Sequence, residues 1–170
     1  METRVRLLGH SVHQSFVFLP LGLLAASVGC DVAFLITDDP SWTVMAYRLM
    51  GAGIITAIAA AVVGYVDWQG IPAGTRAKQV GRVHGIGNVI VVVLFAASWF
   101  MRRNEVAHAA STAALLCSFA GLGLTGLTGW LGGELVSRLG VGVADNANLD
   151  APSSLADESR AERATQDAAA

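Results

Sequence analysis

Four long apolar segments make up most of this 170-residue chain, and almost all of its ionisable residues lie between them. The segments cover residues 14–37, 43–66, 83–101 and 108–130. A helix of about 20 mostly apolar residues can cross a bilayer, and each segment reaches that length. The chain is 54% hydrophobic and only 14% charged, which is unlike a soluble domain. We predict an all-α fold, a four-helix transmembrane bundle with up-down-up-down topology.

The rest of the chain is a polar C-terminal segment. From residue 144 onward, aspartate, asparagine, alanine, serine and glutamate dominate, and no apolar face develops. Segments of this composition bury too little apolar surface to fold. The sequence therefore predicts a four-span transmembrane domain at 1–143 and a disordered acidic tail at 144–170, with at most a fraying helix around 155–164. Its charge pattern gives no reason to expect nucleic acid as a partner.

The arginines and lysines near the spans predict the orientation. Those on the side of both termini are Arg4, Arg6, Arg76, Lys78, Arg82 and Arg138, whereas Arg102 and Arg103 fall on the other side. Basic residues collect on the cytoplasmic side of membrane proteins. We expect a multi-pass protein of the plasma (inner) membrane, embedded in the lipid bilayer, with both termini in the cytoplasm.

Two charged residues lie inside the predicted spans. Asp31 sits six residues before the outer end of the first span, and Arg48 lies at a similar depth in the second. Intramembrane charges usually pair with each other or face a cavity. We predict that Asp31 and Arg48 pair in the outer half of the bundle. They are either a structural ion pair that fixes helix order or part of a proton or ion pathway.

A second group of ionisable residues gathers at the inner ends of the spans. Its members are His10, His13, Asp67, His84 and Glu134. Two imidazoles from facing helices can ligate a haem iron, and histidines with a carboxylate can hold a transition metal. The candidate cofactor-binding residues are His10, His13 and His84, with Asn88 and Glu134 as orienting partners. The alternative is that these groups only cap helices and contact water or lipid headgroups.

Several short motifs resemble a known family. They are residues 9–13 (GHSVH), 20–23 (PLGL), 82–88 (RVHGIGN) and 129–143 (GWLGGELVSRLGVGV), together with Asp31, Gly64 and Asp67. Over residues 9–143 the chain resembles bacterial membrane proteins catalogued as domain of unknown function 2231. This domain is sometimes joined to iron–sulfur or cytochrome modules, so the resemblance implies work near electron transfer. The chain departs from the family pattern at Ser11 and Gln14, where proline is common, and at Ser137 and Leu139, where tyrosine and histidine are common.

Three functions remain open on this basis. The first is a redox-associated membrane module that binds haem b or a transition metal, with His13 and His84 as axial ligands, His10 in reserve and an electron-transfer protein as partner. The second is a structural or interaction protein without a cofactor. The third is a small proton or ion conduit through Asp31 and Arg48, which would need a homodimer because four spans are few for a transporter. The sequence contains no catalytic constellation, so no enzyme class is predicted.

Overall fold

The computed structural model describes residues 1–156, and residues 157–170 lie outside the described part. Its elements in chain order are β1 (Arg6–Leu7), β2 (His10–Ser11), α1 (Val12–Phe16), α2 (Phe18–Thr37), α3 (Ser41–Gly70), α4 (Arg76–Arg102), the 3₁₀ helix η1 (Val106–His108) and α5 (Thr112–Ser137). The helix predicted around 155–164 falls almost wholly on residues outside the described part, and it stays a prediction.

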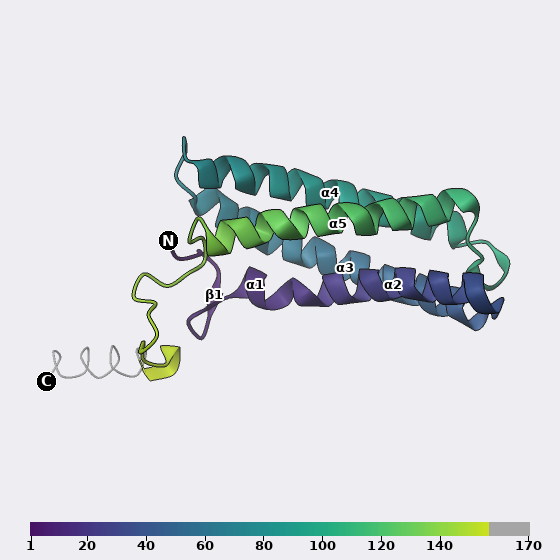
Figure 1. Cartoon of the computed structure of the whole chain (residues 1–170), viewed down its shortest axis with the longest axis horizontal. Helices are drawn as coiled ribbons and strands as arrows, with labels where there is room; N and C mark the ends of the chain where they lie inside the picture. The colour runs from purple at the N-terminus through teal and green to yellow at the C-terminus, as the bar shows by residue number, and fades with distance from the viewer. Residues whose placement is uncertain (157–170) are drawn as a thin grey trace, which may run out of the picture.

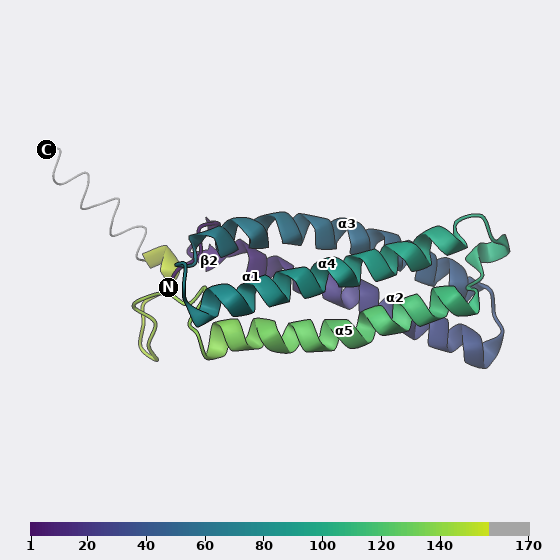
Figure 2. The same cartoon turned by 90° about the horizontal axis from the view of Figure 1, so that it is seen from above.

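Four helical segments are long and apolar enough to cross a membrane, with α1 and α2 together forming the first. They lie side by side along one axis (Figures 1 and 2). The α2–α3 and α4–α5 connections lie at one end, which we call the distal end. The N-terminus and the α3–α4 connection lie at the other, which we call the termini end (Figure 1). The predicted all-α class with four apolar helices is confirmed.

The helices extend past the predicted segments. Helix α4 begins at Arg76 because the Thr75 side chain accepts a hydrogen bond from the backbone N–H of Lys78. The fourth segment, predicted at 108–130, is shifted along the chain. Helix α5 begins at Thr112, where the Ser111 hydroxyl accepts from the backbone N–H of Ala114, and continues to Ser137. Apolar composition marks the residues that prefer lipid, whereas capping side chains decide where the backbone hydrogen bonds begin.

A small β-hairpin at the termini end was not predicted. Strands β1 and β2 pair antiparallel around a turn in which Gly9 has a φ of +80°. One oxygen of the Asp67 carboxylate, near the end of α3, accepts hydrogen bonds from the backbone N–H groups of Arg4 and Val5, both at 2.9 Å. The start of the chain is thereby fixed to α3 at the termini end.

The interior contains few large side chains. Its buried apolar cluster is Leu24, Val28, Met50, Val91 and Phe95. Helix α2 packs mainly against α3, and α4 mainly against α5. Glycines allow this approach: a Cβ at Gly53 would lie 2.6 Å from the Leu24 side chain, and one at Gly121 would lie 2.9 Å from the Phe95 ring. Small residues at helix contacts are typical of membrane bundles.

Candidate functional site

A buried ion pair joins α2 to α4 in the distal half of the bundle. Both terminal nitrogens of the Arg102 guanidinium donate to the Asp31 carboxylate, at 2.5 Å and 2.8 Å. Arg102 also donates to the Ser98 hydroxyl at 3.0 Å, and the Ser118 hydroxyl donates to Asp31 at 3.3 Å. All four side chains are 0% exposed. A bidentate pair with added hydroxyl contacts is the arrangement that offsets the desolvation of buried charges.

The predicted pair between Asp31 and Arg48 is wrong. Arg48 is exposed on α3, and within residues 1–156 it enters no ion pair. The two residues lie at similar depth, but the buried positions on either side of Arg48 are Ala46 and Met50, so its side chain leaves the bundle. The sequence predicts that the third span ends at residue 101, which leaves Arg102 in the outer loop. Helix α4 instead includes Arg102 and turns it inward.

A stack of aromatic rings lies at the distal end of α4. The His108 ring lies over Tyr47 at 3.8 Å between ring centroids, and Tyr47 stacks on Trp99 at 4.9 Å. Nδ1 of His108 donates to the carbonyl of Arg102 at 3.1 Å. The stack therefore connects η1 and α3 to the residue that carries the buried guanidinium.

At the termini end, His13 of α1 contacts α3. Its Nδ1 donates to the carbonyl of Ala60 at 2.9 Å. A carbonyl can only accept, so Nδ1 carries the proton and Nε2 keeps its lone pair. A Cβ at Gly64 would lie 2.7 Å from the His13 ring. Glycine at this position leaves the space that the imidazole occupies.

His84 of α4 makes the same arrangement with α5. Its Nδ1 donates to the carbonyl of Thr128 at 2.8 Å, and a Cβ at Gly132 would lie 3.2 Å from its ring. In both cases the accepting carbonyl belongs to the residue four positions before the glycine. The Asn88 amide nitrogen lies 3.2 Å from Nε2 of His84, and the Thr128 hydroxyl donates to the Asn88 oxygen.

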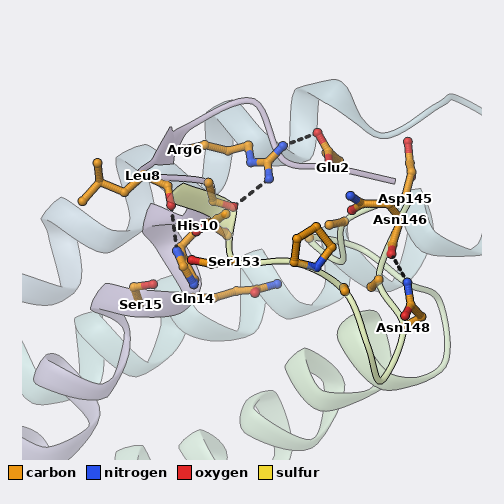
Figure 3. Close-up of a pocket in the computed structure, with 18 residues that line it drawn as sticks. Glu2, Arg6, Leu8, His10, Gln14, Ser15, Asp145, Asn146, Asn148 and Ser153 are labelled. Carbon is orange, nitrogen blue, oxygen red and sulfur yellow. Dashed lines mark hydrogen bonds and ion pairs between the residues drawn. The ribbon is translucent and has the colours of Figure 1, made fainter. Parts of the chain in front are cut away.

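His10 lies apart from these two residues. Its Nδ1 donates to the Leu8 carbonyl within the β-hairpin, at 2.9 Å, and its side chain lines a concavity of about 990 Å³ (Figure 3). The β-hairpin forms one side of this concavity, and residues 142–154 form the other. Neither this concavity nor a smaller one beside it is lined by His13 or His84.

The carboxylates predicted for the inner cluster serve other contacts. Asp67 holds the N-terminal backbone, and its second oxygen is buried without a partner within the described chain. Glu134 lies within α5 rather than after it and accepts from Arg76 at 2.7 Å. Among residues 1–156 no group of three or more His, Cys, Asp or Glu side chains is arranged to hold a metal ion. Cys30 and Cys117 are free thiols.

Comparison with known proteins identifies the family. The family described as "Predicted membrane protein (DUF2231)" matches residues 9–145, most of the chain. The chain belongs to the DUF2231 family. No curated protein and no solved structure matches it. For this DUF2231 protein, the membrane class follows from both the family match and the four apolar helices.

Sequence reasoning missed the residues that complete both sites. Arg102, Ser98 and Ser118 were not connected with Asp31, because a charge next to a predicted span end is usually a loop residue. The carbonyls of Ala60 and Thr128 carry no side-chain signal. A signal for the glycines did exist, since Gly64 and Gly132 belong to the motifs that resemble the family.

Proposed function

We propose that this DUF2231 protein is a small membrane electron-transfer module in which His13 and His84 ligate one haem iron. The proposal rests on the observation that both imidazoles make the same kind of hydrogen bond. Each donates its Nδ1 proton to a backbone carbonyl of a neighbouring helix, which leaves Nε2 as the available ligand atom. Metal-ligating histidines are oriented by a hydrogen bond of this kind from the other ring nitrogen.

The donor set suits haem better than a bare metal ion. A haem iron needs only two axial ligands from the protein, and His13 and His84 supply two imidazoles at one end of the bundle. A bound haem would supply reversible one-electron transfer. The roles of the chain are to hold both rings through Ala60 and Thr128, and to exclude water with the packed helices. At His84 the ligand would take the place of the Asn88 amide near Nε2.

The test is a reduced-minus-oxidised absorption spectrum of the protein purified in mild detergent, before and after addition of haemin. We expect a b-type haem spectrum with one haem per chain, lost in His13→Ala and in His84→Ala. His10→Ala is the matched control and keeps the spectrum, because His10 bonds only within the hairpin. Wild-type protein that binds no haem after haemin addition would refute the proposal.

A structural role for the two histidines is the second candidate, and the contact of Asn88 with His84 favours it. In that case each ring only ties two helices together. An asparagine can donate its amide N–H where Nδ1 donates now, but it is a poor iron ligand. His84→Asn that keeps wild-type thermal stability in a protein without haem supports the structural role. His84→Asn that folds but loses a haem spectrum supports the first proposal.

The conduit hypothesis gains no support from the geometry. The Asp31 carboxylate is fully buried and already accepts from Arg102 and Ser118. An electron-transfer partner and a homodimer stay predictions. A partner that docks at the termini end would meet the side chains of Arg76, Lys78 and Arg82, so we expect it to carry an acidic patch.

A further inference from the structure

Several buried residues of the third span lie a constant number of positions after buried residues of the first span. Asp31 and Arg102 are 71 residues apart, and so are His13 and His84. The same spacing relates four buried residues of α2 to four of the five buried residues of α4: Pro20 to Val91, Leu24 to Phe95, Ser27 to Ser98, and Asp31 to Arg102.

The second and fourth spans repeat in the same way at a spacing of 68. All five buried residues of α5 correspond to buried residues of α3: Ala46 to Ala114, Met50 to Ser118, Gly53 to Gly121, Ala60 to Thr128, and Asp67 to Leu135. The two spacings differ by three because the distal connection from Arg102 to Ala114 is three residues shorter than that from Asp31 to Ala46.

The contacts between the spans repeat as well. His13 bonds to the Ala60 carbonyl beside Gly64, and His84 bonds to the Thr128 carbonyl beside Gly132. Leu24 fills the space at Gly53, and Phe95 fills the corresponding space at Gly121. The sequence retains a trace of this equivalence: residues 23–27 read LLAAS and residues 94–98 read LFAAS.

We propose that the bundle consists of two copies of one helical hairpin, residues 12–70 and 83–137, and that Asp31 and Arg102 determine how the copies pair. The proposal goes beyond the proposed function and does not depend on it. It adds that His13 and His84 occupy equivalent positions in the two hairpins.

The physical basis of the pairing is the sign of the two charges. Residues at one position of two copies related by a twofold axis meet each other when they lie near that axis. If two first hairpins associated, Asp31 would face a second Asp31 in a dry interior, and two second hairpins would place Arg102 against Arg102. Like charges brought together there are strongly unfavourable. Only the mixed pairing joins a carboxylate to a guanidinium, as observed at 2.5 Å.

The test exchanges the two positions in the full chain. Asp31→Arg and Arg102→Asp each place like charges at the centre, so each alone should lose most of the monodisperse protein on size exclusion in detergent. The exchange variant combines both reversals with Met50→Ser and Ser118→Met, because Ser118 contacts Asp31 and corresponds to Met50. If the two hairpins are equivalent, this variant regains most of the wild-type yield and thermal midpoint.

A matched control reverses Asp31 together with Arg48, which is exposed on α3. Asp31→Arg with Arg48→Asp should remain as poor as Asp31→Arg alone. The proposal is overturned if the single reversals still give monodisperse protein and the exchange variant is no more stable than they are, or if the Arg48 control recovers as well as the exchange variant.

An exchange of two apolar residues tests the equivalence of the hairpins if every charged variant fails to fold. Leu24→Phe places a ring at Gly53, and Phe95→Leu leaves the space at Gly121 underfilled, so each should lower the thermal midpoint. Combined, they transfer the ring from one hairpin to the other, and the midpoint should return most of the way to wild type. A combined loss equal to the sum of the single losses would contradict equivalence of the two hairpins.

Discussion

A charged side chain inside a membrane bundle is positioned by two quantities, its depth and the direction of its helix face. Depth follows from the rise of about 1.5 Å per residue, and it placed Asp31 level with Arg48. The direction depends on which face of each helix packs inward. On this basis Arg48 points out of the bundle, whereas Arg102 points into it. A long side chain can also place its charge away from its own backbone: the guanidinium of Arg102, the last residue of α4, reaches the α2 carboxylate.

Removal of Arg102 should destabilise the fold far more than removal of Arg48. Arg102→Ala leaves the Asp31 carboxylate buried without its cation, which costs on the order of 3–5 kcal/mol. Arg48→Ala removes an exposed side chain and should change stability by less than about 0.5 kcal/mol. Unfolding by sodium dodecyl sulfate in mixed micelles measures both. Asp31→Ala combined with Arg102→Ala should cost less than the sum of the two single variants, because no lone charge remains.

Asp39, in the α2–α3 connection, should titrate at lower pH than a free aspartate. Hydrogen bonds from Ser41, first from its backbone N–H and then from its hydroxyl, lower the pKa of this carboxyl below its usual value. The stabilisation is therefore complete above the unfolded pKa of about 3.9 and is lost as the pH falls through the folded pKa. Carboxyl ¹³C NMR at position 39 measures the shift. Ser41→Ala should move the pKa partway back up, and an unchanged value would exclude a role for the hydroxyl.

At the scale of single elements, the sequence predicted which helices exist better than it predicted where they end. The apolar runs identified all four spans, because lipid selects for composition over a whole segment. The start of α5 depends on the Ser111 cap, and the β-hairpin depends on the contact of Asp67 with Arg4 and Val5. These are tertiary or capping interactions of single polar groups, which an average over apolar residues does not detect. The histidine contacts were anticipated only as a cluster, since the accepting groups belong to the backbone.

The stability changes of glycine-to-alanine variants should distinguish the packed faces of the helices from the open ones. Gly53→Ala and Gly121→Ala each place a Cβ within 3 Å of a core side chain, and such overpacking costs about 1–3 kcal/mol. Gly123→Ala meets nothing within 4 Å, so it should leave stability unchanged or raise it slightly through better helix propensity. Thermal unfolding in detergent compares the three. Equal losses at all three positions would mean that the loss reflects helix flexibility rather than packing.

At the scale of the whole molecule, the buried ion pair changes which basic residues count toward the orientation. Arg102 was counted as a basic residue of the outer side, but its charge is neutralised inside the bundle. Arg48, which is exposed on α3, and Arg103 then remain in the distal half, whereas Arg4, Arg76, Lys78 and Arg82 lie at the termini end. Basic residues near the spans determine orientation, so the larger number at the termini end predicts that this end is cytoplasmic.

Cysteine labelling of intact cells should show this orientation. In a background without Cys30 and Cys117, a membrane-impermeant maleimide should label Asp39→Cys from outside and leave Ser153→Cys unlabelled until the cells are opened. Both positions are exposed, so accessibility within the protein is matched. Labelling of Ser153→Cys in intact cells would reverse the orientation, and labelling of both sites would contradict a shared side for the termini.

The contact between Asp67 and the N-terminal backbone can form only after residue 67 has been synthesised. The two ends of this contact are 63 residues apart for Arg4, and chains are made at about 5–20 residues per second. The first residues therefore wait about 3–13 s, while two spans enter the membrane, before their acceptor exists. During that interval the N-terminal backbone is open to any protease or modifying enzyme that reaches it, and this exposure ends when α3 is complete.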